Sequence, residues 1–469
     1  MVEDDDDRDG SGEEDLISGL PDELLHGILV GLRCARAAAR TSVLSRRWHR
    51  VWAHLPELHL DEPAVSSPDP VDGALAGYLA PSLDRLSISL PYHHALAGRA
   101  TPWLRFAVER VAGELRIHVP GPRFRLMEAV VPMGAEAAEI ELLPACGSRA
   151  RRVTLFLRVE WHLRLRPAKP FSALTALTIR GASVEGGELS NLVSTQCPRL
   201  SCLDLFATLV AASNVTIRSD SLHSLELFDV LNTQRLELVA PRLEKMVVSY
   251  LIQAHISAPK LTQLVWRGTG YDPDVGRRLG LLEVGDLVSA SLMQRFDEVD
   301  VLKLGFCIPQ GMAGYQRFLD ATKRLPKCKT LSISLSWNDH GLAPVVLHLL
   351  RSCNGTRKLQ LNYYNDSLRT CPPSCPCRLD ESHKIDDINL NSLNKIEIDS
   401  YEDFHDGLEF VELMFRCNAK VQKLVINYKA SSTPGTKVCE KVRNMGWPKV
   451  KVKFYVFPDG PNGRRVGFE

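Results

Sequence analysis

The sequence predicts a mixed α/β fold in which a small helical block precedes a long array of repeated strands. Two observations carry this prediction. Residues 16–60 place apolar residues at helical spacing, and a short alternating apolar pattern recurs from residue 83 to residue 426. The 469 residues are 45% hydrophobic and 24% charged, which is the composition of an ordinary globular protein with more than one domain.

The helical block begins at a well-marked helix start. Leu24, Ile28 and Leu32 recur at every fourth position and form one apolar stripe, and Pro21 stands where a first helical turn tolerates proline. A second apolar set with the same period ends at residue 55, just before a proline. A segment below about 60 residues seldom buries an adequate core alone. We therefore expect part of its apolar surface to face a partner, although packing on the rest of the chain remains an alternative.

The segments on either side of this block contain few apolar residues. Residues 1–15 hold nine acidic residues and one arginine, and we expect a solvated, disordered leader. Residues 61–75 are rich in proline and poor in apolar residues, which indicates a linker. The remainder carries 56 basic and 47 acidic residues, an excess too mild to predict nucleic-acid binding.

The repeated pattern is an apolar residue, two variable residues, an apolar residue, one variable residue and a third apolar residue. Copies occur at Leu83/Leu86/Ile88, Leu174/Leu177/Ile179, Leu200/Leu203/Leu205, Leu222/Leu225/Leu227, Leu243/Met246/Val248, Leu261/Leu264/Trp266, Val299/Leu302/Leu304, Leu393/Ile396/Ile398 and Val421/Leu424/Ile426, with weaker copies near Leu115, Leu331 and Leu359. From residue 174 to residue 261 they start 26, 22, 21 and 18 residues apart, near the leucine-rich-repeat period of roughly 20 to 29 residues.

Each copy predicts a strand whose apolar side chains stack on those of the next repeat, followed by a helix or loose segment such as 188–193 that returns the chain. A leucine-rich α/β domain without repeats is the alternative, and the recurrence argues against it. The consensus asparagine after the strand is missing, so we predict an irregular leucine-rich-repeat (LRR) solenoid with a curved parallel sheet over residues 76–345, with further repeats in 346–469.

The sequence contains none of the common catalytic or nucleotide-binding motifs, and we expect a protein that is not an enzyme and that needs no cofactor. No run of 18 apolar residues occurs and the start of the chain is acidic. The 12 cysteines are spread along the chain as in proteins whose thiols stay reduced. We therefore expect a protein of the cytoplasm and/or nucleus that neither crosses a membrane nor is secreted.

One cluster could bind a metal. Cys371, Cys375 and Cys377 lie in the run CPPSCPC, and His383 follows six residues later, so three thiolates and one imidazole could surround zinc. The spacing lacks the paired C-x-x-C turns of familiar zinc sites, and the prolines stiffen the loop. We therefore favour a proline-rich connection with buried cysteines, and no bound metal.

Three motifs carry a resemblance to a known family. The runs LPDELL at residues 20–25 and RTSVLSRRW at residues 40–48 resemble the F-box of plant F-box proteins. The repeats are similar to those of plant F-box/LRR proteins. The stretch from CPPSCPC through residues 393–398 and 411–417 to 423–426 is similar to the C-terminal FBD region of that class. The chain thus resembles the plant F-box/LRR proteins of the FBD-containing class.

The resemblance implies a three-helix F-box over residues 16–60 that docks on the Skp-type adaptor, and through it on the cullin, of a Skp–cullin–F-box (SCF) E3 ubiquitin ligase. The residues that match the family's adaptor-binding positions are Leu20, Pro21, Leu24, Ile28, Leu29, Val43, Leu44, Ser45, Trp48 and Trp52. The chain departs from the family at the second helix, where residues 32–37 offer no good N-cap.

The resemblance also implies that the repeats hold an unknown target protein for ubiquitination. The exposed strand positions expected to contact the target are Thr178, Asp204, Glu226, Lys303, Gln360 and Glu397. The alternative is a leucine-rich binding scaffold that works outside any ligase and whose helical block only packs internally.

Overall fold

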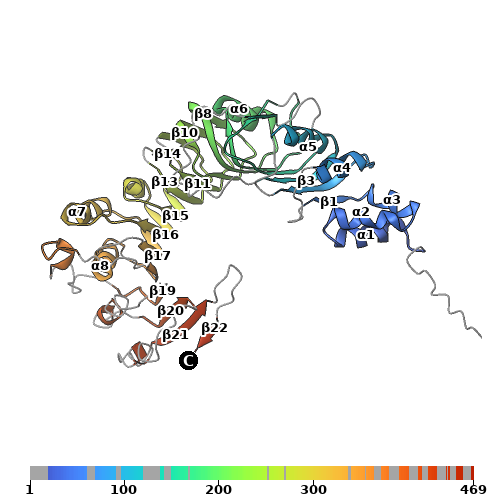
Figure 1. Ribbon diagram of the computed structural model, residues 1–469. Helices are drawn as coiled ribbons and strands as arrows, with labels where there is room; N and C mark the ends of the chain where they lie inside the picture. Colours follow the sequence, from blue (N-terminus) through green and yellow to red (C-terminus); the bar gives the residue numbers. More distant parts are fainter. Residues whose placement is uncertain are drawn as a thin grey trace, which may run out of the picture. The chain divides into compact units, whose positions relative to one another are not determined.

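The structure is a computed structural model. It describes residues 19–60, 69–90, 97–119, 138–141, 149–166, 169–250, 253–268, 271–335, 340–353, 355–363, 371–379, 390–400, 410–414, 421–429, 440, 442–443, 450–457 and 466–468. The chain divides into two compact units, 1–183 and 184–469, which are described separately (Figure 1). The acidic leader predicted for residues 1–15 lies outside the described residues.

Unit 1 opens with the predicted helical block. Its elements are α1 (Asp22–Gly31), α2 (Ala35–Arg40), η1 (Thr41–Val43) and α3 (Arg46–Trp52). Two acidic residues in the first turn of α1 complement the positive end of that helix. The second helix has a cap that the sequence did not predict, because the Sγ atom of Cys34 accepts a hydrogen bond from the backbone N–H of Ala37 at 3.1 Å. The Oγ atom of Ser45 plays the same part for α3, accepting from the N–H of Trp48 at 3.4 Å.

The strands of unit 1 form two parallel ladders. The first runs in the order β1 (Glu57–Leu60), β2 (Leu83–Ser89), β3 (Val111–His118), β5 (Arg152–Phe156) and β7 (Ala176–Val184). The second joins β4 (Ala138–Glu141) to β6 (Trp161–Arg164), which meets β7 through His162 and Ser183. Helices α4 (Asp69–Gly77) and α5 (Ala97–Arg110) lie between the early strands. The predicted linker 61–75 thus ends in a helix, because Val71 and Leu75 give it a buried face.

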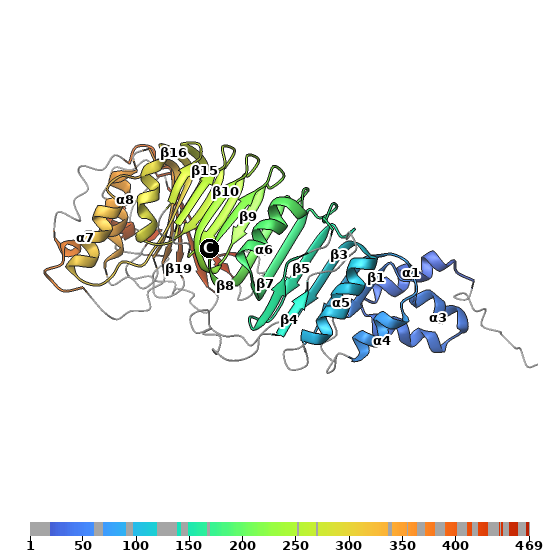
Figure 2. The ribbon, with the colours of Figure 1, turned by 90° about the horizontal axis from the view of Figure 1, so that it is seen from above.

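Unit 2 contains a long parallel ladder. Its order is β8 (Cys202–Arg218), β9 (Ser224–Leu227), β11 (Lys245–Ser249), β13 (Gln263–Arg267), β15 (Arg278–Val284), β16 (Glu298–Phe306), β17 (Lys327–Leu335), β18 (Lys358–Tyr363), β19 (Lys395–Ser400), β20 (Lys423–Lys429) and β21 (Lys451–Phe457). The antiparallel strand β22 (Val466–Phe468) pairs with β21. Figure 2 shows the strands from β8 to β16 running side by side.

A second ladder accompanies the first over part of unit 2. It joins β8, which is long enough to serve both ladders, to β10 (Leu231–Val239), β12 (Gln253–Ser257) and β14 (Tyr271–Asp274). Elsewhere the chain returns through α6 (Gly186–Asn191), η3 (Leu192–Gln196), η4 (Val288–Arg295), α7 (Met312–Ala321), α8 (Leu342–Ser352) and η5 (Pro376–Arg378). The predicted helical return at 188–193 is confirmed. Between residues 231 and 274, however, the returns are strands and not the expected helices or loose segments.

Repeat length explains this difference. Strands β9, β11 and β13 begin at residues 224, 245 and 263, whereas β16, β17 and β18 begin at residues 298, 327 and 358. An extended segment covers about 3.3 Å per residue and a helix only about 1.5 Å, so a return over one distance needs about half as many residues in a strand. The repeats of 18 to 21 residues between β9 and β13 therefore return through strands, and the 20-residue step from β15 to β16 returns through the short 3-10 helix η4. The repeats near 30 residues have room for the α-helices α7 and α8.

The apolar positions of the nine strong copies of the repeat are at most 5% exposed. The predicted irregular LRR solenoid with a curved parallel sheet is confirmed, and the ladder continues from β17 to β18 across the boundary predicted at residues 345 and 346.

In Figure 1, α7 and α8 lie on the outer side of β16 and β17. Among the described residues, no helix combines the length and the apolar character needed to span a bilayer.

Candidate functional site

The helical block of unit 1 exposes an unusual number of large apolar side chains. Leu24 is 55% exposed, Ile28 51%, Leu32 47%, Val43 85% and Leu44 66%. These five stand among thirteen large exposed apolar side chains on the described residues, although residues 24–44 are a small part of the chain. We call these five side chains the apolar patch. Concentrated exposed apolar surface of this kind is typical of a protein–protein contact.

The apolar patch exists because α1 carries two apolar stripes and buries only one of them. Leu25 and Leu29 are buried, whereas Leu24 and Ile28 point to solvent. Two contacts hold α1 against α3. The ring of His26 donates to the carbonyl of Val51 at 3.1 Å, and the guanidinium of Arg47 lies 2.7 Å from the carboxylate of Asp22.

Several predicted adaptor-binding residues have a different place from the one expected. Leu29, Trp48 and Trp52 are buried within unit 1, so they support the helices from inside and do not present a surface. Ser45 is exposed and caps α3. Of the remaining predicted residues, Leu20 is half-buried and its carbonyl accepts a hydrogen bond from Arg47, and the others are exposed. Periodicity finds both apolar stripes of a helix, but it does not say which stripe the rest of the chain covers.

The predicted target-binding positions form a row in unit 2. Strand pairing aligns Asp204 with Glu226 on the neighbouring strand, and the same row runs on through Val247, Val265, Glu283, Lys303, Ser332, Gln360, Glu397, Val425 and Lys453. We call this alignment the strand row. Thr178 holds the corresponding place in unit 1, where it pairs with Thr154. The variable position between the second and third apolar residues of the repeat pattern thus identifies side chains that share one face of the sheet.

Glu397 differs from the rest of the strand row. Its side chain is only 5% exposed, and its carboxylate accepts from the Nζ atoms of Lys395 at 2.9 Å and Lys358 at 3.2 Å. The Nδ2 atom of Asn427 donates to it at 3.4 Å. The expectation that Glu397 is exposed is therefore wrong, because its lysine and asparagine neighbours cover it.

A polar pocket opens on the strand row where β13 to β18 meet. It has a volume of about 470 Å³, and its lining residues are Arg267, Glu283, Gly285, Lys303, Leu304, Gly305, Ser332, Ser334 and Asn362. Gly285 and Gly305 leave the space open because they carry no side chain. A Cβ atom on Gly305 would lie 3.8 Å from its nearest neighbour, so a larger residue fits there without moving the backbone.

The charges in this pocket are of both signs. The carboxylate of Glu283 lies between two cations, 3.4 Å from Arg267 and 3.7 Å from Lys303. Hydroxyl and amide groups from β17 and β18 complete the lining. Such a pocket offers donors and acceptors for a polar side chain of a bound protein, and it contains no nucleophile paired with a base.

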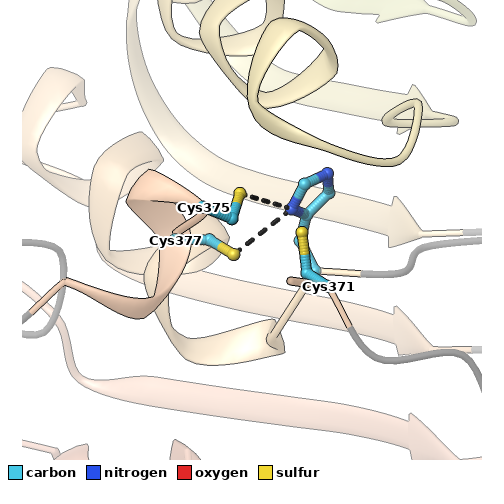
Figure 3. Close-up of side chains that lie close together, drawn as sticks. Cys371, Cys375 and Cys377 are labelled. Carbon is cyan, nitrogen blue, oxygen red and sulfur yellow. Dashed lines mark hydrogen bonds between the residues drawn. The ribbon is translucent and has the colours of Figure 1, made fainter. Parts of the chain in front are cut away.

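The structure brings the three candidate cysteines together. Cys371, Cys375 and Cys377 are all buried, and the fourth member of their group is His340, which comes from the preceding return segment (Figure 3). His383, the expected fourth residue, lies outside the described residues. Burial raises the pKa of the Cys371 and Cys377 thiols, so both are protonated at neutral pH while no metal is bound.

His340 could not be found from local spacing. It precedes Cys371 by 31 residues, which is the length of one repeat in this part of the chain. The only signal was therefore the repeat period, which places residues one repeat apart side by side. The prolines of the CPPSCPC run do not prevent the sulfurs from meeting. The turn is tight instead, since the N–H of Cys375 donates to the carbonyl of Pro372 at 2.9 Å.

Part of the repeat array matches the model of a known protein family. Residues 139–308 match the family model of the LRR repeats of the FBD-associated F-box protein At5g56370. The putative FBD-associated F-box protein At5g56390 of Arabidopsis thaliana is 23% identical over 88% of this chain and 92% of its own length. The Arabidopsis thaliana F-box/LRR-repeat protein 25 is 35% identical over 22% of this chain and 39% of its own length.

A further relative, the F-box protein At5g03100 of Arabidopsis thaliana, is 28% identical over 42% of this chain and 62% of its own length. The alignments with F-box protein At5g03100 and F-box/LRR-repeat protein 25 therefore span less than two thirds of those relatives. The family model and these relatives confirm the resemblance predicted from the motifs: the chain is similar to the plant F-box/LRR proteins of the FBD-containing class.

Proposed function

We propose that the chain is the substrate-recognition subunit of an SCF E3 ubiquitin ligase. In this role the F-box binds a Skp-type adaptor and through it a cullin, while the LRR face binds a target protein. The chain forms no covalent bond itself, because it acts by raising the effective concentration of the target near the ubiquitin-transferring enzymes. The observation that carries the proposal is the apolar patch at residues 24–44. We place this activity in the cytoplasm and/or nucleus.

The apolar patch supports the adaptor contact on energetic grounds. Burying one large aliphatic side chain contributes about 1.5–3 kcal/mol, and a few such anchors at the centre of an interface carry most of its affinity. Leu29, Trp48 and Trp52 are buried and Ser45 serves as the cap of α3, so the proposed contact set is Leu20, Pro21, Leu24, Ile28, Val43 and Leu44. Leu29, Trp48 and Trp52 then act as the internal support that holds this set in place.

The strand row and its polar pocket support the target contact. The row positions alternate along the strands with the buried apolar positions, so the row lies on the opposite face of the sheet from the buried side chains. In Figure 1, α7 and α8 lie on the outer side of β16 and β17. The row supplies half-buried polar side chains of both signs on neighbouring strands. A surface of that extent suits a folded protein or a long peptide better than a metabolite.

The adaptor contact is tested by binding of the purified chain to a Skp-type adaptor. We expect Leu24→Ala with Ile28→Ala to weaken binding at least tenfold, which is about 1.4 kcal/mol, and Leu20→Ala with Pro21→Ala to weaken it as well. Leu79→Ala is the matched control, since Leu79 is 59% exposed but lies outside the apolar patch. Absence of binding by the wild type, or equal binding by all variants, would leave the non-ligase scaffold as the explanation.

The target contact is tested by proximity labelling in cells with and without a proteasome inhibitor. Proteins that are bound for degradation should gain label when the proteasome is blocked. Gly305→Phe fills the polar pocket, and we expect it to remove those proteins from the labelled set. Gln263→Phe adds the same ring at an exposed strand position outside the pocket and should change little. If the two variants give the same labelled set, the pocket is not where the target binds.

A further inference from the structure

The His340 cluster belongs to neither surface used above. Its members come from the return segments of unit 2, on the side of the sheet where α7 and α8 lie, and not from the strand row. His340 directly precedes the start of α8, and the three cysteines lie in and around η5, in the next return segment. A third return segment contributes through Pro309 and Gly311, which precede α7. The cluster thus joins three consecutive repeats.

The spacing of the donor atoms fits a tetrahedral metal site. The four ligand atoms all lie within 4.8 Å of one another. Zinc with Zn–S bonds near 2.3 Å and a Zn–N bond near 2.0–2.1 Å requires S···S edges of about 3.8 Å and S···N edges of about 3.6 Å. The Nδ1 atom of His340 lies 3.3 Å from the Sγ atom of Cys377 and 3.6 Å from that of Cys375 (Figure 3).

The outer contacts orient the histidine as a ligand. The Nε2 atom of His340 lies 2.9 Å from the carbonyl oxygen of Pro309, so Nε2 carries the proton and donates. The Nδ1 atom is then left with its lone pair directed at the sulfurs, which is the tautomer that a metal requires. The ring of Tyr315 lies 5.0 Å from the imidazole and closes one side of the cluster.

The neighbouring backbone is built tightly around this arrangement. A Cβ atom on Gly314 would lie 1.9 Å from the carbonyl oxygen of Pro309, so glycine is required for the close approach that positions this carbonyl. The backbone N–H of Gly311, at a positive φ of 86°, donates to Cys371. A backbone N–H that donates to a thiolate stabilises its negative charge, as in structural zinc sites.

We propose that His340, Cys371, Cys375 and Cys377 bind one Zn²⁺ ion that fastens the return segment after β18 to α7 and α8. Three soft thiolates and one imidazole select zinc over magnesium or calcium, which prefer oxygen ligands. All four ligands come from the protein and all are buried, so the site has no open position and is structural and not catalytic.

The position of the site in the repeat array indicates what the ion would stabilise. The preceding two returns contain the helices α7 and α8, which bury apolar faces against the sheet. In the return after β18, the described residues 371–379 contain only the three-residue turn η5. A short turn buries little apolar surface, and metal binding adds its own free energy to folding. The ion would therefore replace the apolar contacts that a helix supplies in the neighbouring repeats.

The first experiment measures metal in the wild-type full chain, purified under reducing conditions without added chelator. We expect about one zinc per chain by elemental analysis. X-ray absorption at the zinc edge should show three sulfur ligands near 2.3 Å and one nitrogen ligand near 2.0–2.1 Å. A chain that folds with substoichiometric zinc overturns the proposal, and so does a zinc environment of oxygen ligands or a disulfide among the three cysteines in the native protein.

The second experiment distinguishes His340 from His383 as the fourth ligand. We expect His340→Ala to lose at least half of the zinc and to change the absorption spectrum of the Co²⁺-substituted chain, and His383→Ala to match the wild type in both. Cys375→Ser should also lose zinc, whereas Cys202→Ser, at an exposed cysteine on β8, should not. The opposite result for the two histidines assigns the site to His383 and refutes the set proposed here. Adaptor binding by the F-box is measured separately and does not depend on this outcome.

Discussion

The two halves of the unit 2 ladder differ in the segments that return the chain from one strand to the next. Between β8 and β15 the chain returns through strands β10, β12 and β14, whereas after β16 and β17 it returns through α7 and α8. We call the first half the strand-return region and the second half the helix-return region. The sheet positions of the repeat are buried alike in both. The difference shows that an α-helical return needs the longer repeats, although the strand pattern is the same in both regions.

The two regions also differ in what they bury. The strand returns alternate buried and exposed side chains, as in β12, where Ala254 and Ile256 are buried and Gln253 and His255 are exposed. The helix returns bury larger side chains, among them Phe318 and Tyr315, together with the titratable His340, and they half-bury His348. A helix leaves a thicker layer above the sheet than a strand does, and this layer has room for aromatic rings and for the cysteine cluster.

The largest effect should come from the aromatic layer of the helix-return region. Phe318 is fully buried on α7, and its ring centre lies 6.2 Å from that of Phe306 and 5.7 Å from that of Tyr315. We expect Phe318→Ala to lower the free energy of unfolding by about 3–5 kcal/mol, because it removes these contacts and leaves a cavity. Urea unfolding measures this change. Met312→Ala on the same helix is the control at an exposed position, and should change stability by less than about 0.5 kcal/mol.

A smaller effect tests whether the strand returns are truly strands. His255 is exposed at the centre of β12, which pairs with β10 and β14. His255→Pro removes a ladder hydrogen bond and should cost about 2–3 kcal/mol in urea unfolding, whereas His255→Ala should cost well under 1 kcal/mol. Equal stability of the two variants would mean that this return is a loose segment, as the sequence predicted, and the comparison between the regions would fail.

The smallest effect is a pH dependence confined to the helix-return region. Burial, together with the positive charge of nearby Arg351, lowers the pKa of His348 to about 4. In the unfolded chain the same imidazole has a pKa near 6.5, so the unfolded state binds more protons between pH 6.5 and pH 4. The stability that the neutral form contributes is present above pH 6.5 and is lost as the pH falls toward 4. We expect a loss of about 2 kcal/mol between pH 7 and pH 4.5 from this group.

The measurement compares the wild type with His348→Gln over that pH range. Glutamine preserves a polar side chain that reaches Thr322, whose hydroxyl lies 2.9 Å from the Nε2 atom of His348. The variant should have the flatter profile by about the amount given. Parallel profiles for the two proteins would show that His348 is not buried in its neutral form.

Much of the fold could be predicted from the repeat pattern, because each copy of the pattern indicates one strand with one buried face. Residues such as Leu225 and Leu227 are apolar since one strand has one buried face, and this alternation is visible in a few letters of sequence. The second ladder was not predicted because its strands carry weaker signals, such as Ala254 and Ile256 in β12. Their extended conformation follows from the shortness of the repeat and from pairing with neighbouring repeats, which no single segment reveals.

The candidate sites were also predicted only in part, because the sequence shows which residues are apolar but not which of them are covered. Leu24 and Ile28 were identified as contact residues and are exposed, but Leu29 and Trp48 show the same helical period and are buried. Periodicity cannot separate the two sets, since both belong to one amphipathic block. Glu397 occupies an outward strand position yet is covered by Lys358 and Lys395, which stand on the sheet beside it. His340 joins the cysteines only because the chain folds back by one repeat.

The strand row has a metric consequence for anything that lies along it. Neighbouring strands repeat at about 4.8 Å, whereas an α-helix completes a turn every 5.4 Å and an extended chain turns the same face outward about every 6.6 Å. A helix laid across β15 to β18 would bring one side chain per turn close to each successive strand, and it would fall behind by only about 2 Å over that stretch. An extended peptide would lose step after a single strand. The distance between neighbouring strands thus matches the pitch of an α-helix better than it matches the two-residue repeat of an extended peptide.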